Sequence, residues 1–406
     1  MIFIYDLVLR LADFFLHHFL FLFPSKIQKQ WKELQKPWPK LQGDVVLIHA
    51  ASGEIEYAKP LLRWIRQLDP DKKILLTYTS PSILKLLPSS EFYDACVPLP
   101  LDQAERMNEF LRHFHPQKIL IARTDLWHHF LSAAKELQIP TYLFSYTQKK
   151  NLSFLSKLWR KNLLKMITEI HCVHSTDRDE LQSWGFSNSV AVTGDTRIDQ
   201  VIYRLENPRP VPLTVHHQDP VFIFGSTWPE DEEQIFIWIP FLLKKGFRIL
   251  LAPHEVHAEH LQRVIERAQR LEKVALFSSG KWTSEKIMIV DQVGYLAELY
   301  RLGQYAFIGG SFRRKVHSVM EAFAAGLLVV TGPYIQNNRE AVLGLQKSWP
   351  WKNGQYFHLV NILPSASKAL QFFNELPLTN PWKKEIEMDL LDQYGASQRL
   401  VRRILN

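Results

Sequence analysis

One stretch, Tyr305 to Pro333, constrains the fold of this chain more than any other part of the sequence. It begins with an apolar run at 306–308, which is typical of a buried strand. A glycine turn at 309–311 ends that run, and apolar residues at helical spacing follow over 317–326. A second apolar run begins at Leu327. Strand, glycine turn, helix and strand in this order predict an α/β unit of a parallel sheet.

The glycine turn admits two interpretations. Glycine lets the backbone approach a ligand closely, and the N–H groups that open the next helix attract anions. Glu321 lies three residues after Ser318, near the predicted helix start, where its carboxylate could bind a ribose hydroxyl. The same two residues fit a capping box, which needs no ligand. The basic loop at 313–315 favours an anionic ligand.

Length and composition limit the class of protein. A chain of 406 residues is long enough for two domains, and 46% hydrophobic with 22% charged residues excludes a disordered protein. The net charge of +8 indicates anionic partners, either phosphates, nucleic acid or an acidic membrane. No nucleic-acid-binding motif accompanies the basic residues, so we expect no nucleic-acid partner. Cys96 and Cys172 have no metal or redox spacing, which favours a reducing compartment.

The N-terminal segment, residues 1–40, is predicted to be a membrane anchor with a basic linker. Its first part, Met1 to Phe23, is rich in Phe, Leu and Ile, but two acids and an arginine make a position across the bilayer centre costly. Lysines and tryptophans follow over 26–38. An apolar helix before basic and aromatic residues is typical of an interfacial anchor on an anionic membrane. A core helix of a soluble domain is the alternative.

Residues 41–206 are predicted to form a first domain with a doubly wound parallel sheet, because apolar runs alternate with helical segments. Ser52, Gly53 and Glu54 follow one run at the start of a helix, where Gly53 would permit a tight turn, and Asp125 follows another run. Ligands bind at such carboxyl ends of strands, and a carboxylate there could accept a proton from a hydroxyl. Glu54 could equally complement the helix dipole. We expect strands at 45–49, 74–80, 118–122, 140–145, 170–174 and 190–192.

A second domain is predicted over residues 207–380, after a proline-rich linker at 207–220. The pattern of strand and helix restarts at 221–225, and a strong helix start follows it. His254 and the histidine three residues later lack the spacing of a zinc site, so no metal is expected. Residues 381–406 are predicted to form one long closing helix.

Several segments, in the same order along the chain, resemble the Kdo transferases of lipopolysaccharide assembly. They are His49–Glu54, Thr124–Trp127, Val192–Asp199, Gly225–Glu232, Ala252–His254, and Gly309–Gly310 with His317 and Glu321. The resemblance implies the GT-B architecture, with two Rossmann-like doubly wound parallel-sheet domains that face a central cleft behind an N-terminal anchoring helix. It also implies transfer of deoxy-octulosonic acid (Kdo) from CMP-Kdo to a lipid A precursor, lipid IVA, at the cytoplasmic face of the cell inner membrane.

The resemblance further implies roles for single residues. Glu54 would be the general base of an inverting transfer, with Ser52, Gly53 and Asp125 on the acceptor side. The donor side would hold Arg197, Ser226, Thr227, His254, Gly309, Gly310, Ser311, His317, Ser318 and Glu321. Arg197 is a candidate for the Kdo carboxylate by its charge. Helix N–H groups and basic side chains would stabilise the leaving CMP without a metal, and no cofactor is expected.

The chain departs from the family pattern at several positions. The first motif lacks a residue that often precedes Gly-Glu, and Ser318 stands where the family usually has Asn. Arg313-Arg314-Lys315 replaces a glycine-rich loop, and Lys149 and Lys150 stand where we expect an arginine. These departures leave two alternatives, a GT-B transferase with another nucleotide sugar and an inactive membrane-bound scaffold. The joint presence of Glu54, His254 and Glu321 favours an enzyme.

Overall fold

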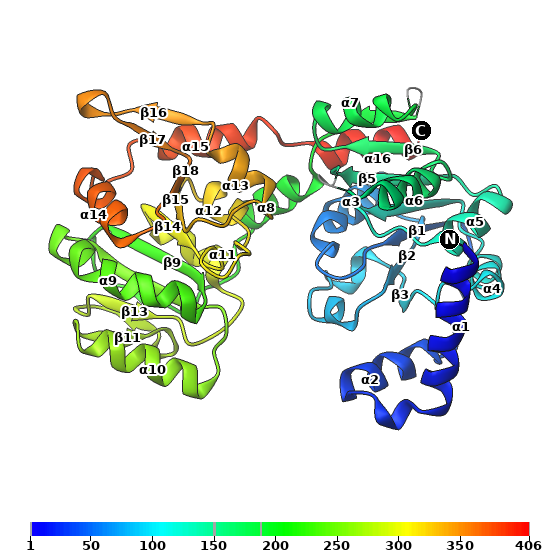
Figure 1. Ribbon diagram of the computed structural model, residues 1–406, viewed down its shortest axis with the longest axis horizontal. Coiled ribbons are helices and arrows are strands. Elements are labelled where there is room, and N and C mark those ends of the chain that lie inside the picture. The colour runs from blue at the N-terminus through cyan, green and yellow to red at the C-terminus, as the bar shows by residue number, and fades with distance from the viewer. Residues whose placement is uncertain (1, 149–151, 187–188, 406) are drawn as a thin grey trace. The chain divides into compact units, whose positions relative to one another are not determined.

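The computed structural model describes residues 2–148, 152–186 and 189–405, so Lys149 and Lys150 lie outside the described residues. The chain divides into two compact units (Figure 1). The first unit holds residues 1–200 and 395–406, and the second holds 201–394. The division falls inside helix α8 (Thr196–Glu206), and the proline-rich segment 207–220 lies within the second unit.

The first unit is built on a seven-stranded sheet in the order β3-β2-β1-β4-β5-β6-β7, and all its strands are parallel. The strands are β1 (Val45–His49), β2 (Lys73–Tyr78), β3 (Ala95–Pro98), β4 (Lys118–Ala122), β5 (Thr141–Tyr146), β6 (Glu169–Cys172) and β7 (Val190–Val192). The helices between them are α3 (Ile55–Leu68), η2 (Pro81–Lys85), η3 (Ser90–Phe92), α4 (Ala104–Phe114), α5 (His128–Glu136), α6 (Phe154–Leu164) and α7 (Ser175–Ser183). The predicted doubly wound parallel sheet is confirmed.

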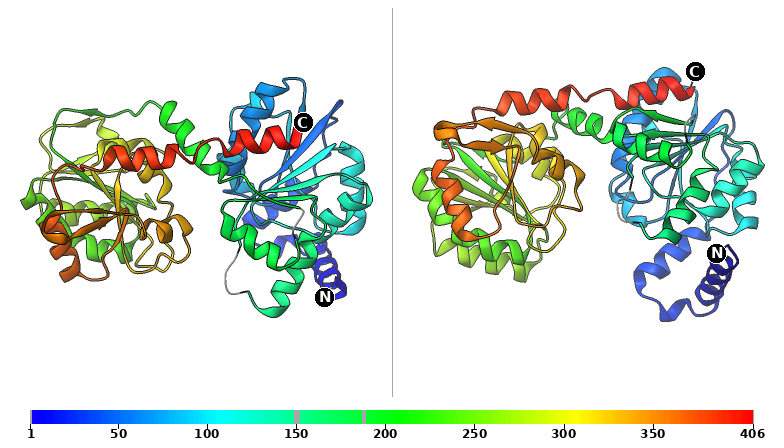
Figure 2. Two further views of the ribbon diagram at one scale, coloured as in Figure 1. Left: turned by 90° about the horizontal axis from the view of Figure 1, so that it is seen from above. Right: turned by 45° about the horizontal axis from the view of Figure 1, so that its top comes forward.

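The sequence pattern explains why α3 covers one face of this sheet. Its apolar residues recur at helical spacing, and Ile55, Leu61 and Ile65 are fully buried. They pack in one core cluster with the central strands and with Leu400 and Ile404 of the C-terminal helix α16 (Ala396–Leu405). Figure 2 shows this C-terminal helix lying against the first unit. The last residues of the chain therefore complete the core of the first unit.

The second unit repeats the same plan. Its seven-stranded sheet is also parallel, in the order β11-β13-β10-β9-β14-β15-β18. The strands are β9 (Val221–Thr227), β10 (Arg248–Pro253), β11 (Val274–Leu276), β13 (Ile287–Ile289), β14 (Tyr305–Ile308), β15 (Leu328–Thr331) and β18 (Val360–Ile362). The helices are α9 (Pro229–Lys245), α10 (Ala258–Gln269), η4 (Phe277–Ser279), α11 (Leu296–Leu299), η5 (Tyr300–Leu302), α12 (Met320–Ala324), α13 (Arg339–Gly344), η6 (Lys352–Gly354) and α14 (Ala366–Glu375).

Two parts of the second unit differ from the sequence predictions. Two small sheets pair β8 (Thr214–Val215) with β12 (Lys281–Trp282) and β16 (Ser348–Pro350) with β17 (Tyr356–His358), so the expected linker contributes a strand. The prediction of a single C-terminal helix over residues 381–406 was wrong. The chain forms α15 (Lys383–Leu391) and α16, and Gly395 between them has φ +92°, a left-handed conformation that interrupts an α-helix.

The N-terminal segment forms α1 (Ile2–His18), η1 (Leu20–Leu22) and α2 (Ser25–Leu34). None of the residues of α1 is buried, which contradicts the alternative of a core helix. Among the described residues, no helix has the length and apolar character that a membrane crossing requires. Figures 1 and 2 show these helices at the edge of the first unit.

Candidate active site

Most of the predicted residues follow the two strands at which the winding of their sheet reverses; Arg197 follows β7 and His254 follows β10. In the first unit these strands are β1 and β4, which Glu54 and Asp125 follow. In the second unit they are β9, which ends with Ser226 and Thr227, and β14, which precedes Gly309. Ligands of open α/β sheets bind at this topological switch point. Each unit therefore carries its candidate residues where its own sheet can bind a ligand.

Glu54 lies at the N-terminal end of α3 and is half-buried. Its Oε2 accepts a hydrogen bond from the backbone N–H of Ser52, at 3.1 Å. Gly53 lies in the turn before the helix, but its φ is outside the left-handed region and open space surrounds the position of a Cβ. The turn predicted at Gly53 is present without requiring glycine. The Glu54 carboxylate is held at the edge of the sheet and remains accessible to solvent.

Asp125 belongs to a hydrogen-bond network that starts in the core. Its Oδ2 lies 2.8 Å from Nε2 of His49, which is fully buried, and His49 Nδ1 lies 2.9 Å from the hydroxyl of Thr77. The indole N–H of Trp127 also donates to Asp125, at 3.1 Å. Burial opposes the charged carboxylate, but the hydrogen bonds from His49 and Trp127 outweigh it and lower the pKa of Asp125. Asp125 is a fixed anion at the end of β4.

Strained backbone marks the strand ends beside these carboxylates. Arg123 has φ +62° and Ser145 has φ +50°, and both are non-glycine residues in a left-handed conformation. The Arg123 guanidinium donates to the hydroxyl of Tyr57 on α3, and Arg197 also lies beside that ring, with its Cζ 5.8 Å from the centroid. The structure thus places Arg197 in the first unit, with Tyr57 and Arg123, and the other predicted donor residues in the second.

Four of the predicted donor residues line one cavity of about 280 Å³ in the second unit. They are Ser226, His317, Ser318 and Glu321, and the other lining residues are Arg204, Gly294, Leu296, Ala297 and Tyr300. Ser226 at the end of β9 has φ +54°, the same strained conformation as the strand ends of the first unit. The cavity therefore combines a guanidinium, a carboxylate, hydroxyls and an imidazole.

The predicted helix start at Ser318 differs in detail. Helix α12 begins at Met320 and is short; the Ser318 hydroxyl donates to Glu321 Oε2 at 2.6 Å and accepts from the backbone N–H of Met320 at 3.4 Å. The side chains of Ser318 and Glu321 are thus bonded to each other at the cavity. Burial, followed by the charge of Glu321, raises the pKa of Tyr300. Glu321 thus lines the cavity and is bonded there to Ser318.

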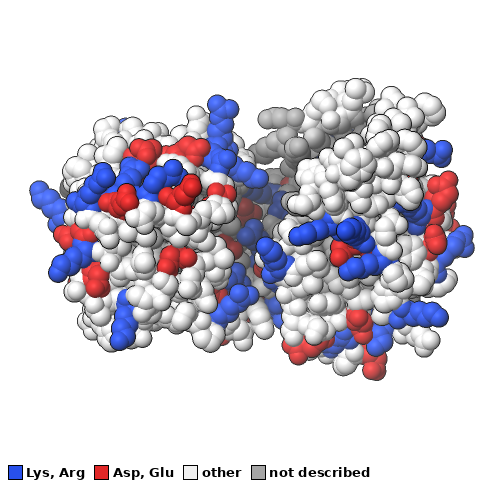
Figure 3. Space-filling view, turned by 90° about the horizontal axis from the view of Figure 1, so that it is seen from below, with Lys and Arg blue, Asp and Glu red and all other residues white. Residues whose placement is uncertain are grey.

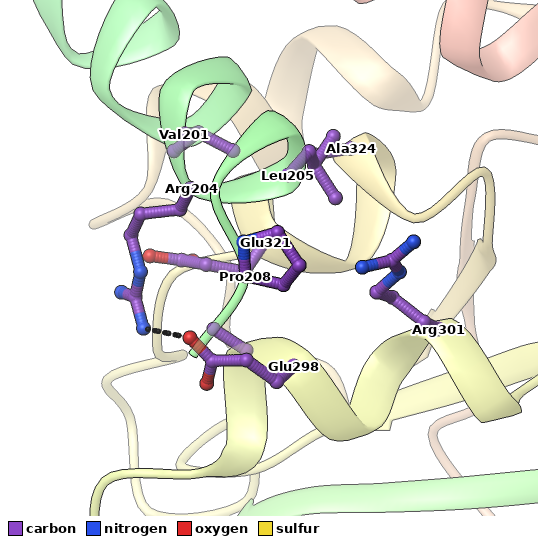
Figure 4. Close-up of a pocket in the computed structure, with 9 residues that line it drawn as sticks. Val201, Arg204, Leu205, Pro208, Glu298, Arg301, Glu321 and Ala324 are labelled. Carbon is purple, nitrogen blue, oxygen red and sulfur yellow. Dashed lines mark hydrogen bonds and ion pairs between the residues drawn. The ribbon is translucent and has the colours of Figure 1, made fainter. Parts of the chain in front are cut away.

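The side chain of Arg204 is held in position by the carboxylate of Glu298. Its Nη2 donates to Glu298 Oε1 at 3.2 Å, and Glu298 is buried (Figure 4). Arg204, Glu298 and Glu321 also line a smaller void of about 10 Å³ with Val201, Leu205, Pro208, Ala297, Arg301 and Ala324. The ion pair with Glu298 supports the guanidinium at the wall of the larger cavity.

An aromatic stack adjoins the cavity. The rings of Trp228 and His254 lie 4.6 Å apart, those of His254 and His317 lie 4.3 Å apart, and both pairs are stacked. The indole N–H of Trp228 donates to Nε2 of His317 at 2.7 Å, and Arg313 lies 4.0 Å from the centroid of Trp228. Burial, with the nearby His254 and Lys315, lowers the pKa of His317 to about 4. His317 is therefore a neutral imidazole that accepts at Nε2.

The glycine turn after β14 is organised by the protein itself. The buried Asp231 of α9 accepts hydrogen bonds from the backbone N–H groups of Gly310 (2.6 Å), Trp228 (2.9 Å) and Phe312 (3.0 Å). A Cβ on Gly309 would lie 2.1 Å from the carbonyl oxygen of Ser226. The glycine is thus required because two strand ends approach each other, and the N–H groups of Gly310 and Phe312 in the turn donate to Asp231.

Two further predicted donor residues are buried. Thr227 donates its hydroxyl to Glu232 at 3.0 Å, and that carboxylate also contacts His260. Ser311 donates to the carbonyl of Ile308 and accepts from the N–H of Gly332. Both side chains are fully buried, so the structure gives them a part in holding the strand ends, and their contact with a ligand stays a prediction.

Sequence reasoning missed four residues of these sites. His49 and Trp228 stand inside the motifs quoted above and could have been chosen from them. Asp231 also stands in such a motif, but its three backbone partners are set by tertiary structure. Arg204 lies in no motif, and no sequence signal pointed to it. In the part of the chain that the structure describes, no group of three His, Cys, Asp or Glu could hold a metal ion.

Comparison with known proteins agrees with this picture. Residues 25–200 match a family model described as 3-deoxy-D-manno-octulosonic-acid transferase (kdotransferase). A relative from Chlamydia muridarum, 3-deoxy-D-manno-octulosonic acid transferase, is 28% identical over 348 residues, which are 78% of this chain and 77% of the relative. A relative of the same name from Rickettsia prowazekii is 25% identical over 382 residues, 86% of this chain and 78% of the relative.

Solved structures share the fold at low identity. UDP-GlcNAc 2-epimerase from Neisseria meningitidis superposes with a TM-score of 0.63 at 16% identity, over 89% of this chain and 100% of that one. The two parallel-sheet units are those of the GT-B fold. The family model and both relatives carry the same description, and over most of its length this chain is similar to 3-deoxy-D-manno-octulosonic acid transferases.

Proposed function

We propose that this protein transfers Kdo from CMP-Kdo to a hydroxyl of a lipid A precursor, lipid IVA, by an inverting and metal-independent reaction. The observation that carries the proposal is the cavity of about 280 Å³ lined by Ser226, His317, Ser318 and Glu321. A carboxylate there suits the hydroxyls of a ribose, and Arg204 suits a phosphate. We assign the donor to the second unit and the acceptor to the first.

The chemistry requires a base and a stabilised leaving group. The acceptor oxygen would form a bond to the anomeric carbon of Kdo while the bond from that carbon to the phosphate oxygen breaks. The hydroxyl proton would pass to the Glu54 carboxylate, and the electron pair of the broken bond would leave with CMP. Fixed positive groups such as Arg204 would stabilise the negative charge that develops on the phosphate.

Asp125 and its network are assigned to the orientation of the acceptor. The carboxylate is held by the buried His49 and by Trp127, so it can present a fixed oxygen to a sugar hydroxyl. The Glu54 carboxylate has a single described hydrogen bond, from the N–H of Ser52, and can approach the reacting hydroxyl. This division gives one carboxylate a binding role and the other a catalytic role.

The experiment compares wild type, Glu54→Gln and Glu56→Gln in transfer of labelled Kdo from CMP-Kdo to the lipid acceptor in detergent with EDTA present. Glu56 is a matched control, because its carboxylate pairs with Lys59 on the same helix. We expect Glu54→Gln to lose about 10²- to 10⁴-fold in rate and to bind CMP normally, and Glu56→Gln to transfer normally. Full transfer by Glu54→Gln would remove the assigned base.

We also propose that α1 lies on an anionic membrane surface, on the cytoplasmic face of the inner membrane. The helix docks on the first unit through polar residues: Tyr5 donates to Asp102 at 2.6 Å, Asp6 pairs with His129 at 2.6 Å, and Asp13 pairs with Arg106 at 3.0 Å. Its apolar side chains face outwards instead, and Phe3 is 78% exposed. Exposed apolar surface of this extent is typical of a membrane contact.

Figure 3 shows a broad uncharged area on the first unit, bordered by Lys and Arg side chains. The test is flotation with vesicles of anionic phospholipid. We expect Phe3→Ser with Phe21→Ser to lower the bound fraction at least about tenfold, because burial of one Phe contributes roughly 1.5–3 kcal/mol. Val293→Ser in the second unit, which is also highly exposed, is the control. Unchanged flotation of the double variant would overturn the membrane contact.

A further inference from the structure

A groove of about 480 Å³ in the first unit is not used by the residues assigned so far. It lies between the loop after β4 and helix α6, and its lining is mostly apolar: Thr124, Leu126, Leu152, Leu155, Ser156, Trp159, Arg160 and Leu163. Thr124 and Leu126 are the immediate neighbours of Asp125, so the groove begins beside the carboxylate assigned to the acceptor. Its position links it to the transfer site of the same unit.

Among the described residues that line this groove, Arg160 is the one with a charged side chain. Its Nε and Nη2 are buried and have no hydrogen-bond partner among the residues that the structure describes. Its Cζ lies 5.6 Å from the centroid of the Tyr146 ring, which supports one face of the guanidinium. Arg160 as a whole is half-buried, but two buried N–H groups without partners are costly unless an anion completes their hydrogen bonds. The geometry therefore points to an anionic ligand.

The apolar walls of the groove indicate that the ligand has an apolar part beside its anionic group. Leu126, Leu155 and Leu163 give the groove an aliphatic lining, and α6 continues outwards with Phe154, which is 78% exposed. Trp159 lines the groove and also contacts Tyr5 of α1, with ring centroids 5.6 Å apart. A free phosphate would leave these apolar walls in contact with water. A hydrocarbon chain attached to the anion would cover them.

We propose that this groove binds the phosphorylated and acylated part of the acceptor lipid, with a phosphate on Arg160 and an adjoining acyl chain against the leucines. The inference rests on the proposed function, because it names a subsite for the acceptor of that reaction. Phosphate binds a guanidinium through two parallel N–H donors, and Nε and Nη2 form such a pair. The acceptor hydroxyl would then reach Asp125 and Glu54 from the adjacent end of the groove.

The test uses the full chain in neutral detergent, with no anionic phospholipid, and a synthetic acceptor with and without its phosphates. With the phosphorylated acceptor we expect Arg160→Gln to raise KM by about 10- to 100-fold and to leave kcat within about twofold, since hydrogen bonds to charged groups contribute roughly 1.5–3 kcal/mol. Lys165→Gln removes the same charge from an exposed position just after α6 and should leave KM unchanged. With the phosphate-free acceptor, Arg160→Gln should equal wild type.

A second variant tests the apolar wall without a buried substitution. Leu155 is 63% exposed, so Leu155→Asn should fold normally, and it should raise KM for a long-chain acceptor and not for a short-chain one. An unchanged KM of Arg160→Gln with the phosphorylated acceptor would overturn the subsite. An equal rise of KM with both acceptors would also overturn it, because Arg160 would then act on something other than the acceptor phosphate.

An experiment without the transfer reaction separates failure of the groove proposal from failure of the proposed function. If wild type transfers no Kdo, direct binding of the phosphorylated acceptor to the detergent-solubilised chain still tests the groove. A Kd that rises at least about tenfold in Arg160→Gln and not in Lys165→Gln supports the subsite without the reaction. Equal Kd values for the two variants would refute it.

Discussion

Asp231 offers the sharpest test of how the second unit builds its site. One buried carboxylate accepts three backbone N–H groups, with Oδ2 serving Gly310 and Trp228 and Oδ1 serving Phe312. These bonds connect the start of α9 to the turn after β14. Asp231→Asn keeps one acceptor oxygen and replaces the other by an N–H₂ group, which faces the N–H of Phe312. One end of the turn then loses its connection.

The cost follows from these contacts. A hydrogen bond to a charged group contributes roughly 1.5–3 kcal/mol, and a donor now faces a donor. Burial raises the pKa of Asp231, which means that the charge itself is costly in this position, and its removal offsets part of the loss. We expect a net loss of about 2 kcal/mol in the free energy that keeps the turn closed, equivalent to about 30-fold in an opening equilibrium.

Amide hydrogen exchange of the peptide covering 309–314 measures that opening directly. We expect exchange about 30-fold faster in Asp231→Asn, together with a weaker Kd for CMP in calorimetry. Glu233→Gln, an exposed acid of the same helix, is the control and should change neither value. Wild-type exchange and CMP affinity in Asp231→Asn would show that the turn does not depend on this carboxylate, and the reasoning would be refuted.

Three further outcomes can be measured. Burial and the neighbouring His254 lower the pKa of His317 to about 4, so the unfolded chain binds more protons than the folded one between pH 6.5 and 4, and stability should fall as pH drops through this range. With the partial exposure discounted, urea unfolding should show a loss of about 1–2 kcal/mol that His317→Gln removes; an unchanged pH slope would contradict it. Asp125→Asn should lower kcat/KM for the acceptor at least about tenfold with unchanged CMP binding, because it weakens the bond to His49, and equal loss of CMP binding would contradict the acceptor assignment. Leu400→Ala should destabilise the first unit by about 2–5 kcal/mol in urea unfolding, because the side chain is fully buried, and a change below about 1 kcal/mol would contradict that packing.

Local sequence patterns predicted much of the fold. The strand at 45–49 and the strand at 118–122 begin and end where the apolar runs do, and the predicted face of α3 is buried. Those elements are decided by hydrophobic periodicity, which local sequence contains. β3 and β18 were missed, because short edge strands are defined by the neighbour they pair with. The break between α15 and α16 depends on the left-handed φ of Gly395, and a single glycine in the sequence does not predict that conformation.

The sequence predicted some residues of the candidate site and not the tertiary contacts that hold them. Glu54 lies just after β1 and Ser226 lies at the end of β9, and these are strands at which the winding of each sheet reverses. The partner of the glycine turn could not be predicted, since Asp231 reaches it across a separation of 79 residues. The two partnerless N–H groups of Arg160 likewise depend on burial, which a charged residue in a helical pattern does not reveal.

The division of the first unit between both ends of the chain has a consequence for biosynthesis. During translation the apolar face of α3 leaves the ribosome early, but Leu400 and Ile404, which cover it, are made last. At about 5–20 residues per second, the intervening residues 201–394 take roughly 10–40 s to synthesise. The C-terminal unit can thus finish folding before the N-terminal one, and a nascent chain that stops before residue 395 presents an open hydrophobic surface to chaperones and proteases.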